Sequence, residues 1–449
     1  MTGRPAISRA LVPLRHRPFR LLVAGQVTSN VGDACYAVAL PWYVLASHGG
    51  AVLLGTVLAA YGVPRTALII VGGYASDRWR PQTVMMATDA ARAFAVAGLA
   101  ATAALGAARA LTLIPIAVVL GAGEGLFLPG SFSIIPRLVP DDDLQAANAL
   151  SSSGTQLATL AGPAIGGALV ALGSPSIAFA LDAASFAISA ITLAGLRRVP
   201  RPIPLADAAP GTAPAAGPGA EPGEAIAGKR SLWAMFRSER ILQIILLVDI
   251  AANLGSGGMS EVSLPSLAHG PLHSGASGYG LILAAFGGGA LVGTIVAGQW
   301  GRPRRPAVTG SYAFLIEAAC IAVVPLLGGV LAVAVAMAGL GITNGFGNVL
   351  TGTAFQRWAP PDMLGRLAGF LTLGSFGVFP VSVALAAFFT RDLGPRSFFV
   401  FTAITLTAAL LAGLTQREWR DFGLNQATDT IKTPETAPPP VPDIEGQTA

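Results

Sequence analysis

The stretch GGYASDRWRP, residues 72 to 81, decides the fold because it ends a long apolar segment with a sudden cluster of charge. Asp77, Arg78 and Arg80 stand together in a chain of 449 residues of which only 11% are charged. Soluble domains carry about 25% charged residues, so this sequence has too little polar surface to face water on all sides. An apolar helix of about 20 residues spans the core of a bilayer. The stretch therefore predicts the end of a membrane-spanning helix and the start of a charged loop.

The same alternation of apolar segments and short polar loops recurs along the chain, which is 53% hydrophobic. It predicts an all-α membrane protein with twelve transmembrane helices embedded in the lipid bilayer. The expected spans are 20–46, 52–74, 83–105, 110–135, 148–172, 176–196, 239–267, 276–300, 306–327, 330–354, 364–389 and 396–416.

The placement of Lys and Arg predicts the orientation of these spans. If the N-terminus is cytoplasmic, the outer loops hold only Arg109, Arg391 and Arg396, and most other basic residues fall on the inner side. Positive residues favour the cytoplasmic side of a membrane, so both termini and residues 72–81 should be cytoplasmic. The basic N-terminal segment lacks the apolar core and cleavage site of a secretory signal. We expect a multi-pass protein of the plasma or inner membrane.

The two halves of the sequence match each other at an offset close to 220 residues. PRLVPDDDLQAANAL (136–150) aligns with QRWAPPDMLGRLAGF (356–370), and GAGEG (121–125) aligns with GITNG (341–345). A nearly constant offset indicates a duplicated six-helix unit, and parallel repeats around a central pathway are typical of secondary transporters.

The repeat and a change in composition divide the chain into five regions. Residues 201–228 are rich in Pro, Ala and Gly without periodic apolar spacing, which indicates a flexible linker. The regions are a cytoplasmic N-terminal tail (1–19), an N-terminal six-helix bundle (20–196), a cytoplasmic linker (197–238), a C-terminal six-helix bundle (239–416) and a cytoplasmic C-terminal tail (417–449), disordered from about residue 424.

Residues 72–81 resemble the loop between helices 2 and 3 of the major facilitator superfamily, whose pattern is G-x-x-x-D-R-x-G-R-R. Gly73, Asp77 and Arg78 match, whereas Arg80 and Pro81 replace the expected Gly and Arg. The resemblance implies that this loop latches the cytoplasmic ends of two bundles by pairing in one conformation and releasing in another. The alternative is a topological anchor. The residues assigned to the latch are Gly73, Asp77, Arg78, Arg80, Asp89 and Arg92, of which the last two are three apart and so also suit an intrahelical pair.

A second motif, GPAIGG (162–167), is similar to the G-P-x-x-G-G core found in exporters of this superfamily. Proline removes a backbone donor and bends a helix, while glycines permit close contact with a neighbour. Ordinary small-residue packing is the alternative reading of Gly162, Pro163, Gly166 and Gly167. The stretches 17–45 and 127–150 also resemble the branch that includes siderophore and macrolide exporters.

Ionisable residues inside the spans are the candidates for function, because such residues are costly in a membrane and usually face a cavity or a partner. Asp33 and Glu124 lie near the middle of spans that line the central pathway in this superfamily, and Arg65 can reach either. We expect Glu124 and Asp33 to carry proton coupling or to bind a cationic substrate; a hydrogen bond between helices is the alternative. Arg65, Asp249 and Asn344 complete the set of coupling or substrate candidates.

One departure from the superfamily limits what the resemblance implies. Drug–proton antiporters often carry R-x-x-Q-G in the fourth span, where this chain has Gly121 and Glu124 in place of the Arg and the Gln. A proton step that relies on that Arg does not transfer to this chain.

Several classes of function find no support in the sequence. GEAIAGKR (223–230) lacks the hydroxyl residue of a phosphate loop and follows no strand, and the scattered His and Cys residues have no metal spacing. We expect no enzyme activity, no catalytic residues, no cofactor, no metal and no nucleic acid partner, and a monomer that takes a small-molecule substrate.

The sequence thus predicts a secondary active transporter, a proton-coupled exporter of a small amphipathic molecule such as a drug or siderophore. Uptake or facilitated diffusion is an alternative within transport. A non-transporting membrane receptor or scaffold is an alternative from another class.

Overall fold

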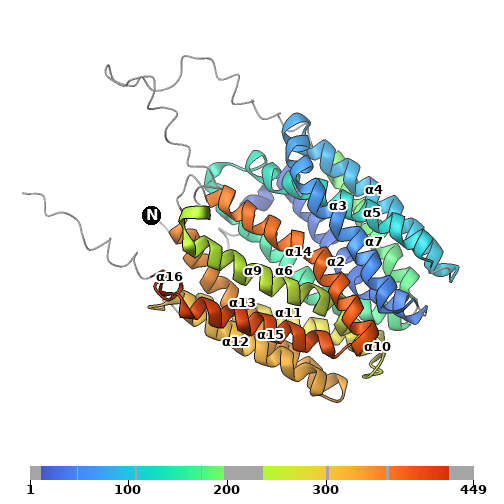
Figure 1. The fold of residues 1–449 in the computed structure, drawn as a ribbon. Helices are drawn as coiled ribbons and strands as arrows, with labels where there is room; N and C mark the ends of the chain where they lie inside the picture. The colour runs from blue at the N-terminus through green and yellow to red at the C-terminus, as the bar shows by residue number, and fades with distance from the viewer. Residues whose placement is uncertain are drawn as a thin grey trace, which may run out of the picture.

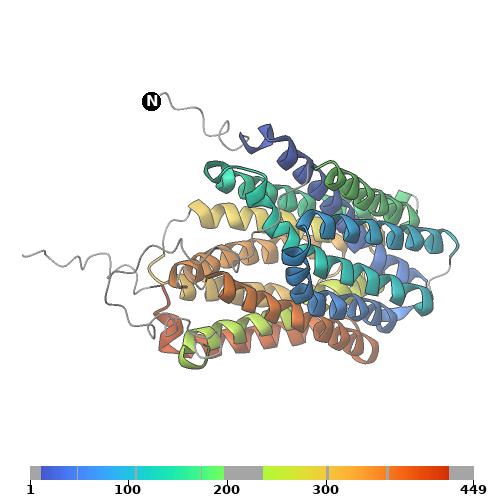
Figure 2. The same ribbon diagram turned by 90° about the horizontal axis from the view of Figure 1, so that it is seen from above.

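The computed structural model describes residues 12–47, 49–106, 109–172, 174–196, 236–299, 303–359 and 364–423. The described residues form helices, turns and bends, with no strand among them. The described residues include twelve long helical segments. They run roughly parallel or antiparallel, in two sets that lie beside each other (Figures 1 and 2). The prediction of an all-α membrane protein is confirmed, whereas most of the linker (197–235) and the tail from 424 lie outside the described residues.

The N-terminal set is coloured blue to green in Figure 1 and starts after a short 3₁₀ helix, η1 (Val12–Arg15). Its members are α2 (Arg17–Ala46), α3 (Gly50–Arg78), α4 (Pro81–Ala104), α5 (Ala110–Ile134), α6 (Asp141–Leu172) and α7 (Pro175–Ala194), with the 3₁₀ helix η2 (Ile135–Arg137) between α5 and α6.

The C-terminal set is coloured yellow-green to red in Figure 1. Its first helix, α9 (Arg240–Gly258), continues through one π-helical turn, η4 (Met259–Ser263), into α10 (Leu264–His269). The remaining elements are α11 (Gly275–Gln299), α12 (Pro306–Val323), the 3₁₀ helix η5 (Val324–Leu326), α13 (Val330–Trp358), α14 (Leu364–Leu393), α15 (Ser397–Thr415) and the short α16 (Arg417–Arg420).

Proline fixes several of the helix starts. Pro18, Pro81, Pro175 and Pro306 lie in the first turn of α2, α4, α7 and α12. Proline suits this position because its fixed φ is helical and its missing N–H would lack an intrahelical partner anyway. Each long helix of the C-terminal set begins 220 to 225 residues after its N-terminal counterpart, in agreement with the offset of the sequence repeat.

The helix ends differ from the predicted spans mainly where a span is followed or preceded by polar residues. Helix α3 continues to Arg78, α6 begins at Asp141 and α13 continues to Trp358. Apolarity marks only the part of a helix that lies in hydrocarbon, whereas the backbone ladder continues into the polar region beyond it. The quoted stretch 72–81 is therefore mostly helical, and only Trp79 and Arg80 separate α3 from α4.

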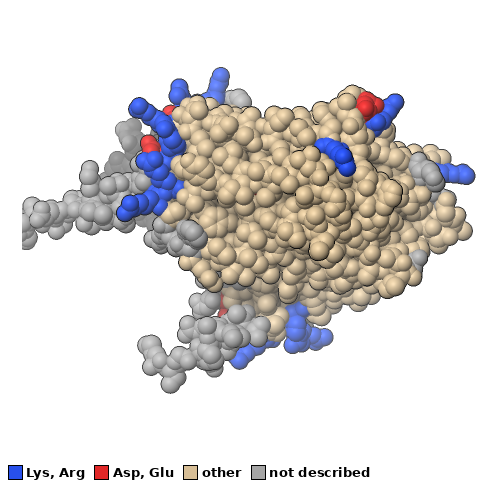
Figure 3. Space-filling view, turned by 90° about the horizontal axis from the view of Figure 1, so that it is seen from below, with Lys and Arg blue, Asp and Glu red and all other residues tan. Residues whose placement is uncertain are grey.

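Eleven helices of the described residues are long and apolar enough to cross a membrane. Helix α2 has the length but is less apolar, because Gln26, Asn30 and Asp33 interrupt it. Large apolar side chains such as Phe94 and Leu111 face outward, at 80% and 86% exposure, as helices surrounded by lipid require. On the face shown in Figure 3, most of the positive side chains lie toward the edges, and much of the surface between them is uncharged.

The two sets contact each other mainly through two helix pairs, α3 with α14 and α6 with α11, and also where α2 meets α10 and α11. Between α3 and α14, the Thr66 hydroxyl donates to the Phe376 carbonyl at 2.9 Å, and Gly62 packs on Phe379 and Pro380. Trp42 of α2 also meets His269 at the end of α10, with ring centroids 4.9 Å apart. These contacts fall on the middle of the helices and on the ends near residues 47–50, 269–275 and 393–397, the side predicted to be external.

Candidate functional site

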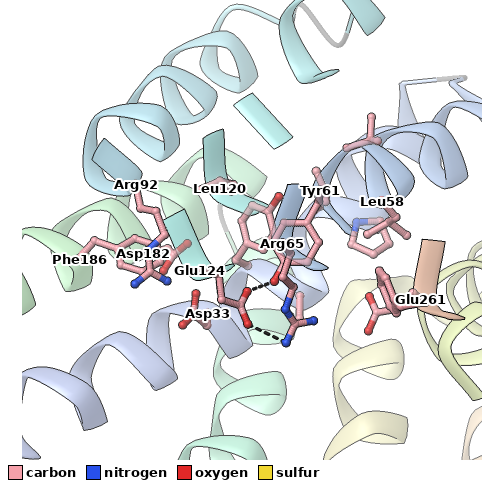
Figure 4. A pocket seen from close by; sticks show the side chains of 16 residues that line it. Asp33, Leu58, Tyr61, Arg65, Arg92, Leu120, Glu124, Asp182, Phe186 and Glu261 are labelled. Atoms are coloured by element: carbon pink, nitrogen blue, oxygen red, sulfur yellow. Dashed lines mark hydrogen bonds and ion pairs between the residues drawn. The ribbon is translucent and has the colours of Figure 1, made fainter. Parts of the chain in front are cut away.

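A cavity of about 250 Å³ lies between the two sets of helices and is called the central cavity here (Figure 4). Helices α2, α3, α4, α5 and α7 supply most of its wall, and η4 and α14 supply the rest. Its ionisable lining residues are Asp33, Arg65, Arg92, Glu124, Asp182 and Glu261. The structure thus brings together three sequence-predicted candidates, Asp33, Glu124 and Arg65, in one space.

Close packing of α3 on α5 places Arg65 beside Glu124. A Cβ atom at Gly121 would collide with the carbonyl oxygen of Tyr61, and one at Gly125 would collide with that of Arg65. Glycine at both positions therefore lets the two backbones touch. Tyr61 and Arg65 are one turn apart on α3, so both side chains reach Glu124.

The Arg65–Glu124 ion pair is the polar centre of the cavity. Arg65 Nη2 lies 2.8 Å from Glu124 Oε1, and the Tyr61 hydroxyl donates to Glu124 Oε2 (Figure 4). The Arg65 guanidinium lies over the Phe376 ring at 4.1 Å from the ring centroid, and its Nε is buried without a hydrogen-bond partner among the described residues. Glu124 therefore has both oxygens engaged, while Arg65 keeps unused donors.

Arg92 forms a second ion pair at the opposite wall. It binds Asp89 on the same helix, and Asp89 Oδ2 also accepts a hydrogen bond from the Ser189 hydroxyl at 2.6 Å. The guanidinium lies between the rings of Phe127 and Phe186, at 4.8 and 4.3 Å from their centroids. Both charged side chains are buried, so this pair holds α4, α5 and α7 together.

The central cavity contains more carboxyl groups than cations. Two guanidinium groups, of Arg65 and Arg92, face four carboxyl groups, of Asp33, Glu124, Asp182 and Glu261. Arg65 is paired with Glu124, and Arg92 with Asp89 outside the lining. Asp33, Asp182 and Glu261 have no cationic partner among the ion pairs of the described residues. The cavity can therefore take up positive charge, as protons or as part of a ligand.

Glu261 reaches the central cavity from the other set of helices. It lies in the π-helical turn η4, which follows the glycines of NLGSGGMS (253–260), and Figure 4 shows it facing Arg65 across the cavity. π-Helical turns are frequent at functional sites because the extra residue re-aims side chains within a continuous helix. Among the described lining residues, Glu261 is the one ionisable residue that the C-terminal set contributes.

The other two candidates, Asp249 and Asn344, lie away from this cavity, within the C-terminal set. Asp249 accepts hydrogen bonds from the Ser375 hydroxyl at 2.7 Å and from Asn253 Nδ2 at 3.1 Å. Asn344 Nδ2 donates to Glu317 Oε1 at 3.1 Å. Asp249, Glu317 and Asn344 line a separate space of about 270 Å³.

The structure divides the residues assigned to the latch. Gly73 has open space around it, Arg78 is exposed and Arg80 is half-buried, and neither Arg is in an ion pair among the described residues. Asp77 lies in the last turn of α3, but its side chain lies outside the described part. Asp89 and Arg92 form the intrahelical pair that their spacing predicts, and Arg92 also lines the central cavity. A latching role for the six residues stays a prediction.

The exporter-like motif lies where α6 meets two other helices at once. A Cβ at Gly166 would lie 2.8 Å from Cys35 Cα, and one at Gly162 would collide with the Ala34 side chain, so both glycines seat α6 on α2. Gly167 faces α11 instead, where a Cβ would lie 2.8 Å from the Ala276 carbonyl oxygen. Next to it, Gly280 of α11 lies against the Pro163 carbonyl. The motif thus packs α6 within its own set and across the boundary between the sets.

Replacing Gly167 with Val is expected to destabilise the protein by about 1–3 kcal/mol, because the added atoms meet backbone rather than a flexible side chain. Gly98→Val is the matched control, because Gly98 is also within a helix but faces open space. Titration of the purified protein with SDS, followed by circular dichroism, measures the loss. Equal unfolding midpoints for the two variants would show that α6 and α11 do not pack this closely.

Three acidic residues that line cavities are not among the candidates predicted from the sequence. Glu261 and Asp182 line the central cavity, and Glu317 lines the separate space beside Asp249 and Asn344. Tyr61 is also absent from the predicted candidates, yet its hydroxyl donates to Glu124 Oε2. The available signal for Glu261 was the glycine-rich segment before it, whereas nothing in the sequence shows that Asp182 and Glu317 face inward.

Comparison with known proteins agrees with this architecture. Residues 8–417 match the family model described as transmembrane secretion effector, within the major facilitator superfamily. The multidrug efflux pump Tap of Mycobacterium tuberculosis (strain H37Rv) is 25% identical over 420 residues, covering 92% of this chain and 96% of that protein. The enterobactin exporter EntS of Citrobacter koseri is 26% identical over 364 residues, covering 80% of this chain and 81% of the exporter.

Solved structures show the same fold at low sequence identity. The D-xylose-proton symporter superposes with a TM-score of 0.68 at 15% identity, covering 88% of this chain and 96% of the symporter. A bacterial homologue of the lysosomal transporter Spinster superposes with a TM-score of 0.66 at 16% identity, covering 91% of this chain and 98% of that one. With the family model matching almost all of the helical region, the chain belongs to the transmembrane secretion effector family of major facilitator superfamily transporters.

Proposed function

We propose that the protein is a proton-coupled exporter that moves a small amphipathic molecule, a drug or a siderophore, out of the cell by alternating access. The observation that carries this proposal is the buried Arg65–Glu124 pair in a cavity between the two sets of helices. We further propose a multi-pass protein of the plasma membrane, monomeric, with both termini cytoplasmic and with the bundles and linker bounded as in the sequence analysis.

Alternating access requires two sets of helices that can separate at one end while they touch at the other. The contacts through Thr66, Gly62 and Trp42 fall on the middle and on the side assigned as external. In the proposed orientation, this arrangement corresponds to a conformation that is closed to the outside. Glycines along the contact between α6 and α11 leave few side chains to interlock, so the two sets can move relative to each other there.

In this proposal, proton coupling arises because a proton and the Arg65 guanidinium compete for the Glu124 carboxylate. As a carboxylate it accepts from Arg65 and Tyr61, and a proton on it removes the charge that holds Arg65. The released guanidinium then faces Asp33 and Glu261, which line the same cavity and are in no ion pair among the residues that the structure describes. Because Glu261 belongs to the opposite set, this exchange links protonation to the relative position of the two sets.

Two alternatives remain open to test. Uptake or facilitated diffusion is the alternative within transport. Tap is named an efflux pump and EntS an exporter, and their similarity to this chain supports export. A receptor or scaffold needs no cavity with unpaired carboxyl groups, and such groups are costly in a membrane. The cavity therefore favours transport over a passive role.

The exporter proposal predicts proton-driven accumulation of ethidium, an aromatic cation, in everted membrane vesicles that contain the protein. Acidifying the vesicle lumen should drive accumulation, and a protonophore should abolish it. Vesicles without the protein serve as the control. Accumulation that a protonophore leaves unchanged would indicate facilitated diffusion, and transport in the opposite direction would indicate uptake. Absence of transport for ethidium and for a panel of antibiotics and siderophores would favour the receptor.

A further inference from the structure

A second cavity lies inside the C-terminal set and is called the C-terminal cavity here. It measures about 270 Å³ and is formed by α9, α12, α13, α15 and α16. None of the ionisable residues of the central cavity lines it. Asp249 and Glu317 contribute two carboxyl groups, and no Lys, Arg or His is among the described residues that line it.

Among the described residues, the carboxyl groups of the C-terminal cavity have neutral hydrogen-bond donors and no cationic partner. Glu317 is 6% exposed, and its hydrogen-bond donor is the Asn344 amide, at 3.1 and 3.4 Å from its two oxygens. Asp249 accepts from Ser375 and Asn253. These donors are neutral, so each carboxylate is only partly compensated, and burying an unpaired carboxylate is expensive. The cavity as built is complementary to a positive charge.

An apolar wall faces these carboxyl groups. Phe314, Ile321, Leu406 and Trp419 line the cavity together with Val248. Trp419 is 4% exposed, and its indole N–H donates to the Ser311 hydroxyl at 2.9 Å, which fixes the ring against the wall. A cavity with an apolar wall and a few convergent polar groups is typical of small-molecule sites.

Two asparagines connect the C-terminal cavity to the boundary between the sets. Asn344 and Asn348 line it, and they also line a neighbouring space of about 390 Å³ between α6, α11 and α13. Asn348 Nδ2 donates to Asn344 Oδ1 at 3.0 Å, so the two side chains form one polar partition. A molecule at the boundary between the sets can reach Glu317 by displacing this partition.

We propose that the C-terminal cavity binds an organic ammonium ion, with the ammonium group at Asp249 and Glu317 and the apolar body against Phe314 and Trp419. The inference rests on the proposed function in one respect, because it takes the ligand to be the exported molecule. It assigns the substrate class as amphipathic amines and places a binding site outside the central cavity.

The chemistry of the lining separates this ligand from other classes. A bare metal ion prefers a tight cage of oxygen ligands, whereas half of this wall is hydrocarbon and aromatic ring. The described residues also hold no cluster of three or more His, Cys, Asp or Glu suited to a metal. A neutral molecule would leave both carboxyl groups uncompensated, and an anion would be repelled.

Protection of an engineered cysteine from a maleimide tests the site directly. Ser256 lines the cavity and is exposed, so Ser256→Cys provides a local target, with Cys35 and Cys320 replaced by Ala to remove the native thiols. 4-Phenylbutylamine is the probe, and 4-phenylbutanol is its neutral analogue. We expect the amine to slow labelling at least ten-fold at saturation, and the alcohol to leave the labelling rate unchanged.

The carboxyl groups are tested in the same background. Asp249→Asn and Glu317→Gln should each weaken protection by the amine about ten-fold or more, whereas Glu418→Gln, an exposed carboxyl group in the same set, should not. Phe314→Ala provides a second test if a carboxyl variant fails to fold. It should weaken binding of the amine, and so its protection of the thiol at position 256, without removing a charge. Equal protection by amine and alcohol, or full protection in Asp249→Asn/Glu317→Gln, would overturn the proposal.

The result separates this site from the exporter proposal. Carboxyl-dependent protection together with absent ethidium transport would establish the site and reject export. Proton-driven ethidium transport without protection at position 256 would retain export and reject the site.

Discussion

Glu124→Gln is expected to lower proton-driven transport by roughly 100-fold while the protein stays folded. The side chain keeps its size and can still accept from Tyr61, but it can no longer exchange a proton or pair with Arg65. A hydrogen bond to a charged group contributes up to about 3 kcal/mol, which corresponds to roughly 100-fold in rate when it is used in the rate-limiting step. Folding should persist because Asp33 and Glu261 line the same cavity and can compensate Arg65.

Transport of ethidium into everted vesicles, with and without an imposed proton gradient, measures this effect. Transport down an ethidium gradient should survive in Glu124→Gln, because only the coupling step is removed. Arg65→Gln/Glu124→Gln should be as uncoupled as Glu124→Gln alone, since either change breaks the pair. Glu418→Gln is the control, because this exposed carboxyl group pairs with Arg240 at 3.6 Å on the surface. Proton-driven transport at the normal rate in Glu124→Gln would remove Glu124 from the mechanism.

The fold follows from the sequence because each of its determinants is local. Apolar length sets the spans, proline sets several helix starts, and the repeat offset relates the two sets. The predicted span 306–327 and the observed elements from Pro306 to Leu326 agree almost residue by residue. Helix ends such as Arg78 were missed because they extend beyond hydrocarbon, where hydropathy gives no signal.

The candidate site could be predicted only in part, because the direction in which a side chain points depends on how its helix packs in the tertiary structure. The resemblance placed Asp33 and Glu124 in spans that line the pathway, and Arg65 was the cation within reach of both. Whether Asp182 and Glu317 face inward depends on how each helix is rotated about its axis. A soluble amphipathic helix shows this rotation by a polar stripe, but a helix that is apolar on all sides has no such stripe. Glu261 depends further on the π-helical turn, which shifts the register of every residue after it.

The pair Asp89–Arg92 shows how an apparent loop network can instead be part of the interior. Its position in the sequence, soon after GGYASDRWRP, suggested a role with the cytoplasmic loop. Asp89 is 0% exposed and Arg92 is 5% exposed, and both contact α7 or its aromatic neighbours. A spacing of three residues predicts the pairing itself, but it does not predict which face of α4 the pair occupies.

Arg92→Leu is therefore expected to destabilise the protein more than any surface substitution, by about 3–5 kcal/mol. The change leaves the buried Asp89 carboxylate with a hydrogen bond from Ser189 and no cation, and it also removes the guanidinium from the rings of Phe127 and Phe186. Arg92→Lys should lose less stability than Arg92→Leu, because it keeps the positive charge and loses only the stacking of the planar guanidinium on the two rings. SDS titration of purified variants, followed by circular dichroism, measures the free energy of unfolding.

The double variant Asp89→Leu/Arg92→Leu separates the cost of an unpaired charge from the value of the pair. Replacing both partners by apolar groups of similar size is often close to neutral, because neither charge then has to be buried. We expect the double variant to recover most of the stability that Arg92→Leu loses. Transport should stay impaired, because Arg92 also lines the central cavity. If Arg92→Leu alone unfolds at the same SDS fraction as the double variant, then Asp89 is not held as a buried carboxylate, and the central cavity has one fewer fixed charge beside it than the structure indicates.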